Sequence, residues 1–186
     1  MLRQAENLEA VTYSVEGVRP ADLQSLQGLP VTGLTLRGGS EFGPGELGSA
    51  VAEFPQLSSL TIIGADLNGR DVHAISRLKQ LRELQLYPAN GFRWSDQDIA
   101  AIAEMTNLKS LGIDLRQTLS AQDKEIIVRL PGLTRIDLFY DRDCDEEFLM
   151  QLNKIETLET VVVSSNLESE HGPVFVSSER YLAIRK

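Results

Sequence analysis

Few side chains in this sequence belong to the types that bind metal ions or attack a substrate. The 186 residues include one cysteine, Cys144, and two histidines, His73 and His171. A structural zinc site needs several cysteine or histidine ligands at close spacing, and neither histidine has such a neighbour. No histidine has a local context suited to a serine–histidine–aspartate triad, so a nucleophilic Cys144 is the one enzymatic alternative. We therefore predict no catalytic residue, no metal site and no enzymatic activity.

Two further segments superficially suggest ligand binding. The acidic run from Asp141 to Glu147 resembles a calcium loop, but it lacks the glycine turn and the distal glutamate of an EF-hand. The glycine-containing stretches 38–39 and 43–45 lack the spacings of phosphate-binding loops, so we interpret them as turns. The acidic run is interpreted as the start of a helix, and no cofactor is predicted.

The net charge restricts the classes of partner. The sequence holds 18 basic and 27 acidic residues, which gives a formal net charge of −9. Binding to nucleic acid depends on clustered lysine and arginine, so no nucleic-acid partner is expected, whereas a basic protein fits. Acidic residues recur where helices are expected to begin, at Asp71, Asp96, Asp98, Asp123, Asp145, Glu146 and Glu147. Carboxylates there complement the helix dipole, so we expect this charge mainly to cap helices and to keep the chain soluble.

The elements that must position any site follow from one apolar pattern, which occurs six times. Each copy has an apolar residue, two residues, a second apolar residue, one residue and a third apolar residue. The copies are Val31-Leu34-Leu36, Leu57-Leu60-Ile62, Leu81-Leu84-Leu86, Leu108-Leu111-Ile113, Leu133-Ile136-Leu138 and Leu158-Val161-Val163. Their first positions lie 26, 24, 27, 25 and 25 residues apart, a period typical of solenoid repeats.

Residues 81–108 illustrate how one unit is expected to fold. Its leucines alternate as in a strand, and Ser95 with Asp98 is typical of the capping box that starts a helix. Apolar columns precede each repeat start by six and three residues, at Val51, Ile75, Ile102, Ile127 and Leu152 and at Phe54, Leu78, Met105, Leu130 and Ile155. In other units the column of Trp94 is filled by Leu67, Leu119 and Cys144, and the N-cap position of Ser95 is filled by Asn68, Ser120 and Asp145. We therefore expect Trp94 and Cys144 to be buried packing residues.

This pattern resembles the leucine-rich-repeat family, whose motif is L-x-x-L-x-L-x-x-N/C-x-L, over residues 26–167. The resemblance implies an α/β fold, a right-handed leucine-rich-repeat solenoid shaped as a horseshoe arc, with a parallel sheet on the concave face and helices on the convex face. The ladder asparagine of the family is retained only at Asn166, and the other units have Ala65, Ala89, Arg116 and Asp141. Those turns are expected to be looser, or satisfied by backbone groups or water.

A single domain is expected over residues 1–186, with residues 1–25 as an N-terminal cap and degenerate first repeat, and 168–186 as a C-terminal cap. The N-terminus lacks the apolar run of a signal peptide, and no stretch approaches the roughly 18 apolar residues of a membrane span. One cysteine suits a reducing compartment. We therefore expect a cytoplasmic protein without a membrane partner, with secretion by a route that needs no cleaved signal as the alternative.

The two caps are expected to contain short strands, because terminal repeats must close the open ends of the core. Leu8, Val11 and Tyr13 form a weak first copy of the pattern, 23 residues before the first full copy. Near the other end, residues 174–177 and 181–184 are predicted to be two short strands.

The strand positions outside the apolar pattern form rows on the concave face that the resemblance implies. One row is Thr35, Thr61, Gln85, Gly112, Asp137 and Val162, and the next is Arg37, Ile63, Tyr87, Asp114, Phe139 and Ser164. Large apolar groups ringed by charge are typical of binding hot spots. The predicted partner-binding residues are Tyr87, Phe139, Arg82, Arg135, Asp137, Asp114, Ile63 and Lys109.

The predicted function is a non-enzymatic protein–protein interaction module that binds one protein partner through the concave sheet face. Rigid repeats suit this role, because a preformed surface loses little entropy on binding. Two alternatives use the same module. One is an immunity or inhibitor protein that neutralises a basic toxin or enzyme, and the other is a secreted effector or adaptor.

Overall fold

Short strands alternate with single helices along the chain. The computed structural model describes residues 11–39, 41–89, 92–115, 119–140, 146–165 and 180–183. The strands are β1 (Val11–Glu16), β2 (Val31–Arg37), β3 (Ser59–Ile63), β4 (Glu83–Tyr87), β5 (Ser110–Asp114), β6 (Arg135–Tyr140), β7 (Thr160–Ser165) and β8 (Arg180–Ala183). The helices are α1 (Pro20–Leu26), α2 (Glu46–Ala52), α3 (Gly69–Ile75), α4 (Asp96–Ala103), α5 (Ala121–Val128) and α6 (Glu146–Leu152).

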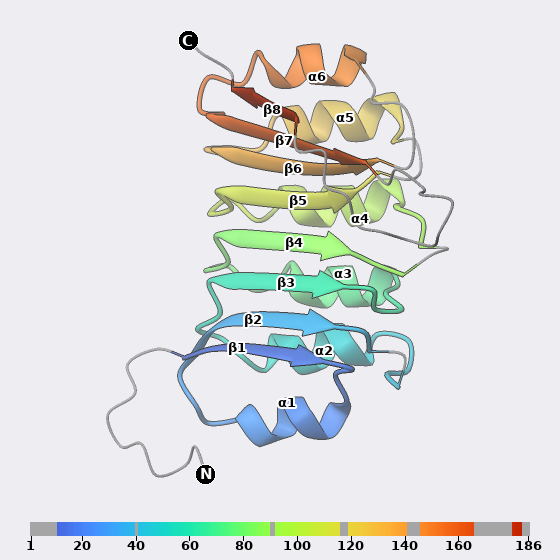
Figure 1. Ribbon diagram of the computed structural model, residues 1–186, viewed down its shortest axis with the longest axis vertical. Coiled ribbons are helices and arrows are strands. Elements are labelled where there is room, and N and C mark those ends of the chain that lie inside the picture. The colour runs from blue at the N-terminus through green and yellow to red at the C-terminus, as the bar shows by residue number, and fades with distance from the viewer. Residues whose placement is uncertain are drawn as a thin grey trace.

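The described strands form one open sheet whose spatial order follows the chain from β1 to β8 (Figure 1). Strands β1 to β7 pair in parallel, and β8 pairs antiparallel with β7. The helices lie behind the sheet on one side, and the described elements leave its other side uncovered (Figure 1). The repeat pattern thus correctly predicted an α/β fold in which every unit adds one strand and one helix to a shared core.

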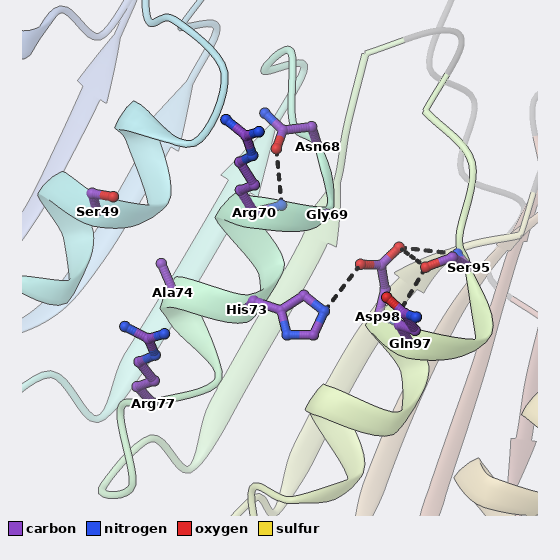
Figure 2. A pocket seen from close by; sticks show the side chains of 10 residues that line it. All are labelled: Ser49, Asn68, Gly69, Arg70, His73, Ala74, Arg77, Ser95, Gln97 and Asp98. Atoms are coloured by element: carbon purple, nitrogen blue, oxygen red, sulfur yellow. Dashed lines mark hydrogen bonds and ion pairs between the residues drawn. The ribbon is translucent and has the colours of Figure 1, made fainter.

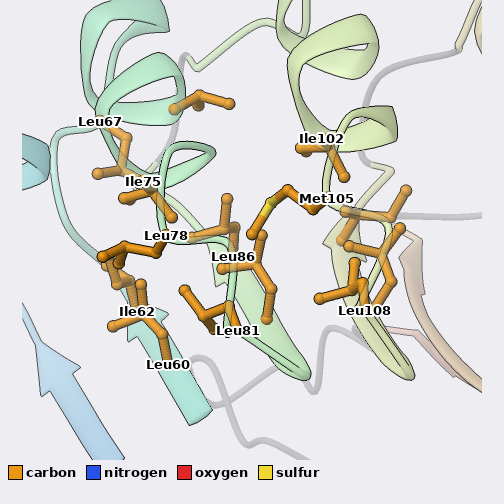
Figure 3. Close-up of a cluster of buried hydrophobic side chains, with 14 of the residues drawn as sticks. Leu60, Ile62, Leu67, Ile75, Leu78, Leu81, Leu86, Ile102, Met105 and Leu108 are labelled. Atoms are coloured by element: carbon orange, nitrogen blue, oxygen red, sulfur yellow. The ribbon is translucent and has the colours of Figure 1, made fainter. Parts of the chain in front are cut away.

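The residues of the apolar pattern form the core between the sheet and the helices. All of them are buried except Val163, which is half-buried, and the two helical columns are buried throughout. Figure 3 shows Ile75 and Ile102 on the helix side of this core, facing strand residues such as Leu60 and Leu86. A fully buried leucine or isoleucine contributes roughly 1.5–3 kcal/mol relative to an exposed one, so these columns are the main source of stability.

The helices begin with the capping residues that the sequence predicted. The N-caps of α3, α4 and α5 are Asn68, Ser95 and Ser120. Three residues later, an aspartate accepts a hydrogen bond from each N-cap backbone N–H, at 3.0 Å for Asp71, 2.9 Å for Asp98 and 3.2 Å for Asp123. The expectation that these aspartates cap helices is confirmed, and at 1%, 3% and 3% exposed they are buried while doing so. The capping bonds replace water around each carboxylate, which allows its burial.

Asp71 also joins two neighbouring units. Its Oδ1 accepts a hydrogen bond of 2.8 Å from the backbone N–H of Gly48, in the buried space between α2 and α3. A Cβ atom at Gly48 would lie 2.4 Å from the Cα of Asp71, so the two helices approach more closely than any other residue allows. In the next unit, the equivalent Oδ1 of Asp98 lies 4.0 Å from Nε2 of His73. The Oδ1 of Asp123 has no hydrogen-bond partner among the described residues.

Backbone hydrogen bonds replace the asparagine ladder in the turns that follow β3 and β4. The N–H of Ala89 donates to the carbonyl of Ala65 at 2.8 Å, and the N–H of Gly64 donates to the carbonyl of Tyr87 at 2.7 Å. Ala65 is fully buried, so its carbonyl needs a partner inside the protein. The expectation that backbone groups satisfy these turns is confirmed at this position.

The N-terminal strand pairs in a register different from the predicted one. Val11 pairs with Val31, and after an irregularity Tyr13 pairs with Leu34, where the prediction placed Val11. The predicted alignment is therefore wrong by two strand positions, and Leu8 lies outside the described residues. A shift of two residues keeps the same side chains on the same face, so the apolar pattern could not distinguish the two registers.

The C-terminal end is described only in part. Strand β8 matches the predicted strand at 181–184 and covers the edge of β7, whereas the predicted strand at 174–177 lies outside the described residues. The acidic run was interpreted as a helix start, and α6 begins within it at Glu146. Other positions outside the described part of the chain are Arg116, Asp141, Cys144, Asp145, Asn166 and His171.

Candidate functional site

The open face is the sheet surface opposite the helices, and strand alternation places three rows of residues on it. The register confirms the predicted middle row of Thr35, Thr61, Gln85, Gly112, Asp137 and Val162. Along one side of it lie Arg37, Ile63 and Tyr87 from β2 to β4, followed by Asp114 and Phe139 from β5 and β6. Along the other side lie Gly33, Ser59, Glu83, Ser110, Arg135 and Thr160.

Side chains of the middle row form a polar chain that crosses several strands. Thr61 Oγ1 donates to Gln85 Oε1 at 3.4 Å, and Gln85 Nε2 donates to Asp137 Oδ2 at 3.2 Å. Arg135 Nε donates to the same Oδ2 at 3.1 Å, and its Nη2 lies 3.0 Å from Asp137 Oδ1. Gln85 therefore links β4 to β6 across the intervening strand, and the network fixes the orientation of the charged pair.

Gly112 on β5 makes this crossing possible. A Cβ atom at Gly112 would lie 2.9 Å from Cγ of Gln85 and 2.5 Å from the hydroxyl oxygen of Tyr87. Both side chains thus lie directly over the glycine. A glycine within a strand often marks such a close approach, because it has no side chain to occupy the space.

Tyr87 and Phe139 form the apolar centre of the open face. Their ring centroids are 6.4 Å apart at an interplanar angle of 66°, an edge-to-face arrangement that aromatic pairs favour. Burial raises the pKa of the Tyr87 hydroxyl above its usual range, and the nearby Asp137 carboxylate raises it further. No described residue forms a hydrogen bond with this hydroxyl, so at neutral pH it is a protonated donor that a partner can use.

Two predicted contact residues are less exposed than expected. Asp114 and Asp137, both predicted to contact a partner, are only 6% and 7% exposed. Asp137 is covered by Gln85 and Arg135, which donate hydrogen bonds to its carboxylate. Direct contact of either aspartate with a partner stays a prediction.

Of three further predicted contact residues, Ile63 lies on the open face, whereas Arg82 and Lys109 lie just before strands. Ile63 is half-buried in the row of Tyr87, as predicted. Arg82 and Lys109 are exposed but directly precede β4 and β5, so they lie off the three rows. Lys109 Nζ donates to the carbonyl of Gly132 at 3.1 Å, in the turn before the next strand. Lys109 therefore contacts the backbone of the next unit, and its contact with a partner stays a prediction.

The column that precedes the helices is apolar packing where it is described. Leu67 and Leu119 are 8% and 6% exposed. Trp94 is half-buried against the core, 4.8 Å from Phe92 between ring centroids, and its Nε1 donates to the backbone carbonyl of Asp114 at 2.7 Å. Trp94 thus joins the loop before α4 to the end of β5, which agrees with the prediction that it is a packing residue.

A second surface lies on the helix side. A groove of about 540 Å³, here called the α3 groove, is lined by Ser49, Asn68, Gly69, Arg70, His73, Ala74, Arg77, Ser95, Gln97 and Asp98 (Figure 2). Its basic residues are Arg70 and His73 on α3 and Arg77, which follows the C-cap of that helix. Their spacing of three and four positions is the spacing of one helix face. The sequence contained this signal, but His73 was considered only as a metal ligand or a surface residue.

Among the described residues, no group of three or more histidine, cysteine, aspartate or glutamate side chains is arranged to hold a metal ion. Within the same part of the chain, no helix is both long and apolar enough to cross a membrane. No protein-family model and no curated protein sequence matches this chain. The functional interpretation therefore starts from the geometry of the open face and of the α3 groove.

Proposed function

We propose that this protein is a solenoid of the leucine-rich-repeat type that acts as a non-enzymatic protein-binding module through the open face of its sheet. The repeat pattern of residues 26–167 and the in-order parallel sheet support the family resemblance, with the open face on the concave side. The observation that carries the proposed function is the Tyr87–Phe139 pair, an apolar centre bordered by polar groups on an uncovered sheet face.

The polar network around this pair supports the same function. Hydrogen bonds from Gln85 and Arg135 to Asp137 hold the face in one arrangement before a partner arrives. A surface that is already ordered loses less conformational entropy on binding than one that must rearrange. Tyrosine at the centre of such a surface supplies both apolar area and a hydroxyl donor, the combination found at many binding hot spots.

A specific version of this function is an inhibitor or immunity protein that neutralises a basic toxin or enzyme. The net charge of −9 favours long-range attraction of a basic partner. A secreted effector or adaptor would use the same face. Identifying the partner separates these versions, and protection of cells that co-express a basic toxin would support the first.

The test is affinity capture from a lysate of the source organism with three baits. They are the native chain, the Tyr87→Ala/Phe139→Ala double variant and a Met150→Ala control. Met150 is 64% exposed on α6, so the control removes an exposed apolar side chain from the helix side and leaves the open face intact. We expect one protein to be retained by the native and control baits and lost from the double variant. With that protein purified, the double variant should weaken binding by about 2 kcal/mol or more.

Retention of the same partner by all three baits would place binding outside the open face and overturn the proposal. Thermal melting shows whether the double variant is folded, since both of its rings are half-buried. If it is not folded, Thr61→Lys replaces it, because it adds a long charged side chain to the open face at a half-exposed position. Unchanged capture by a folded Thr61→Lys variant would count against the proposal in the same way.

A further inference from the structure

The α3 groove carries two arginines whose positive charge is not neutralised by an ion pair with a described residue. The side chains of Arg70 and Arg77 are exposed, and neither makes an ion pair or a hydrogen bond with a described residue. Arg19, Arg129 and Arg135 are each ion-paired with an aspartate or a glutamate. Arg37 and Arg82 are exposed and make no ion pair with a described residue, but they lie outside this groove. The feature of Arg70 and Arg77 is that they line one groove together with His73, which in a chain of net charge −9 points to a ligand that supplies the negative charge.

His73 lies on α3, between Arg70 on the same helix and Arg77 just after its end. Its side chain is 47% exposed, and its Nε2 is 4.0 Å from Oδ1 of Asp98 on the neighbouring helix α4. Figure 2 shows the imidazole turned toward Asp98, with Arg70 in the first turn of α3 and Arg77 just beyond the end of the helix. The three basic residues line the same groove.

Among the described lining residues, Asp98 is the one carboxylate, and it already accepts hydrogen bonds within the protein. Its Oδ2 accepts hydrogen bonds from the backbone N–H of Ser95 at 2.9 Å and from Ser95 Oγ at 2.7 Å. The side chain is only 4% exposed and lies in the first turn of α4, where the helix dipole favours negative charge. Two exposed arginines against one buried, hydrogen-bonded carboxylate leave the groove locally positive.

The lining chemistry distinguishes between classes of anionic ligand. Guanidinium groups pair best with carboxylates and phosphates. Small-molecule sites are mostly apolar, whereas the described residues of this lining include no aromatic residue and only Ala74 as an apolar side chain. Arg70 and Arg77 lie at opposite ends of α3, a helix of 7 residues and about 10 Å in length, so they suit several spaced anionic groups better than one small ion. An extended acidic peptide meets both conditions.

We propose that the α3 groove binds an acidic polypeptide segment, with Arg70 and Arg77 as the anchoring cations and His73 and Gln97 as polar contacts. The surrounding negative charge of the protein repels such a segment elsewhere, which confines it to the groove. The groove lies on the helix side of the sheet, opposite the open face (Figures 1 and 2). This interaction is therefore independent of the function proposed for the open face.

The experiment measures fluorescence anisotropy of a labelled oligoglutamate peptide mixed with the full chain at low ionic strength. The Arg70→Gln/Arg77→Gln double variant is compared with Arg93→Gln/Lys154→Gln, which makes the same change in net charge at two exposed basic residues outside the groove and off the open face. We expect roughly ten-fold weaker binding for the groove variant and less than about two-fold for the control. Added salt should weaken binding to the native chain. The charge-reversed variant Arg70→Glu/Arg77→Glu should bind labelled oligolysine more tightly than the native chain does.

Three outcomes would overturn the proposal. Equal weakening in both double variants would show that only net charge matters. No binding of oligoglutamate to the native chain would show that the groove has no affinity for acidic peptides. Displacement of the peptide by inorganic phosphate, but not by acetate at the same ionic strength, would identify a phosphate site instead. All substituted side chains are exposed, so thermal melting should confirm a native fold for each variant.

Discussion

The open face and the α3 groove differ in whether their central charged side chains have a partner of opposite charge within the protein. On the open face, Gln85 and Arg135 converge on the carboxylate of Asp137, so the charges satisfy one another within the sheet. In the groove, Arg70 and Arg77 have no acidic partner among the described residues. Paired charges fix the shape of a surface, whereas cations without a partner attract a ligand of opposite charge. One repeat architecture thus supports a rigid face suited to apolar contact and a groove suited to electrostatic contact.

Two glycines show a parallel difference in packing. The space above Gly112 on the open face is filled by the side chains of Gln85 and Tyr87, whereas the space beside Gly48 is filled by the backbone of Asp71. Side-chain ends can rotate away from an added methyl group, but the backbone of a packed helix moves only if the helix moves. The contact between helices should therefore tolerate substitution less well than the open face.

The largest loss of stability is expected from a substitution that disrupts this contact between helices. Gly48→Ala places a Cβ atom 2.4 Å from the Cα of Asp71, and we expect it to lower the free energy of unfolding by about 2–3 kcal/mol. Alanine favours an isolated helix over glycine by about 1 kcal/mol, so a net loss would show that the clash dominates. Urea denaturation measures the change, with Glu53→Ala at the exposed end of the same helix as a control. A stabilised Gly48→Ala variant would contradict the close approach.

The next prediction compares how much a paired arginine of the open face and an arginine of the α3 groove contribute to stability. Arg135→Ala leaves the carboxylate of Asp137, 7% exposed, without its cation, so we expect a loss of about 1–2 kcal/mol in unfolding free energy. Arg77→Ala removes an exposed side chain without an ion-pair partner among the described residues, and should change stability by less than about 0.5 kcal/mol. Chemical denaturation of both variants checks the difference. Equal losses would remove the contrast between paired and unpaired cations.

A smaller effect is expected from Gly112→Ala on the open face. The new methyl group would lie 2.5 Å from the Tyr87 hydroxyl oxygen, so the ring must shift from its position beside Phe139. Because a side chain can yield, we expect a loss of about 1 kcal/mol, less than that of Gly48→Ala. Denaturation gives the size, and a changed near-ultraviolet circular dichroism signal reports the moved ring. A loss larger than that of Gly48→Ala would contradict the prediction that the open face tolerates substitution better than the contact between helices.

The smallest effect at neutral pH concerns the Tyr87 hydroxyl, which makes no hydrogen bond to a described residue. Burial raises the pKa of this hydroxyl above its ordinary value of about 10, so the folded protein keeps a proton that the unfolded chain releases. The contribution of Tyr87 is therefore intact below about pH 10 and is lost as the pH rises further. We expect native protein and Tyr87→Phe to have similar stability at pH 7, and the native protein to lose more above pH 10. Parallel loss in both proteins at alkaline pH would show that the raised pKa is absent.

Much of the fold could be predicted because its determinants are local and periodic. The apolar columns, the N-caps Asn68 and Ser95, and the middle row of the open face all follow from spacing within a unit and from alternation along a strand. The register of β1 could not be predicted, because a shift of two residues preserves the face on which each side chain lies. The groove could have been found from the spacing of Arg70, His73 and Arg77, had basic residues been traced along helix faces.

The sequence by itself therefore determined the repeat, the core and the starts of the helices, since each depends on residues close together in the chain. Only the tertiary structure decided which polar groups are paired and which are buried. Gln85 reaches Asp137 across β5, and Asp71 is buried because Gly48 of the preceding unit supplies a backbone donor. These contacts depend on the separation of neighbouring units and on the reach of each side chain, and hydrophobic periodicity specifies neither of these distances.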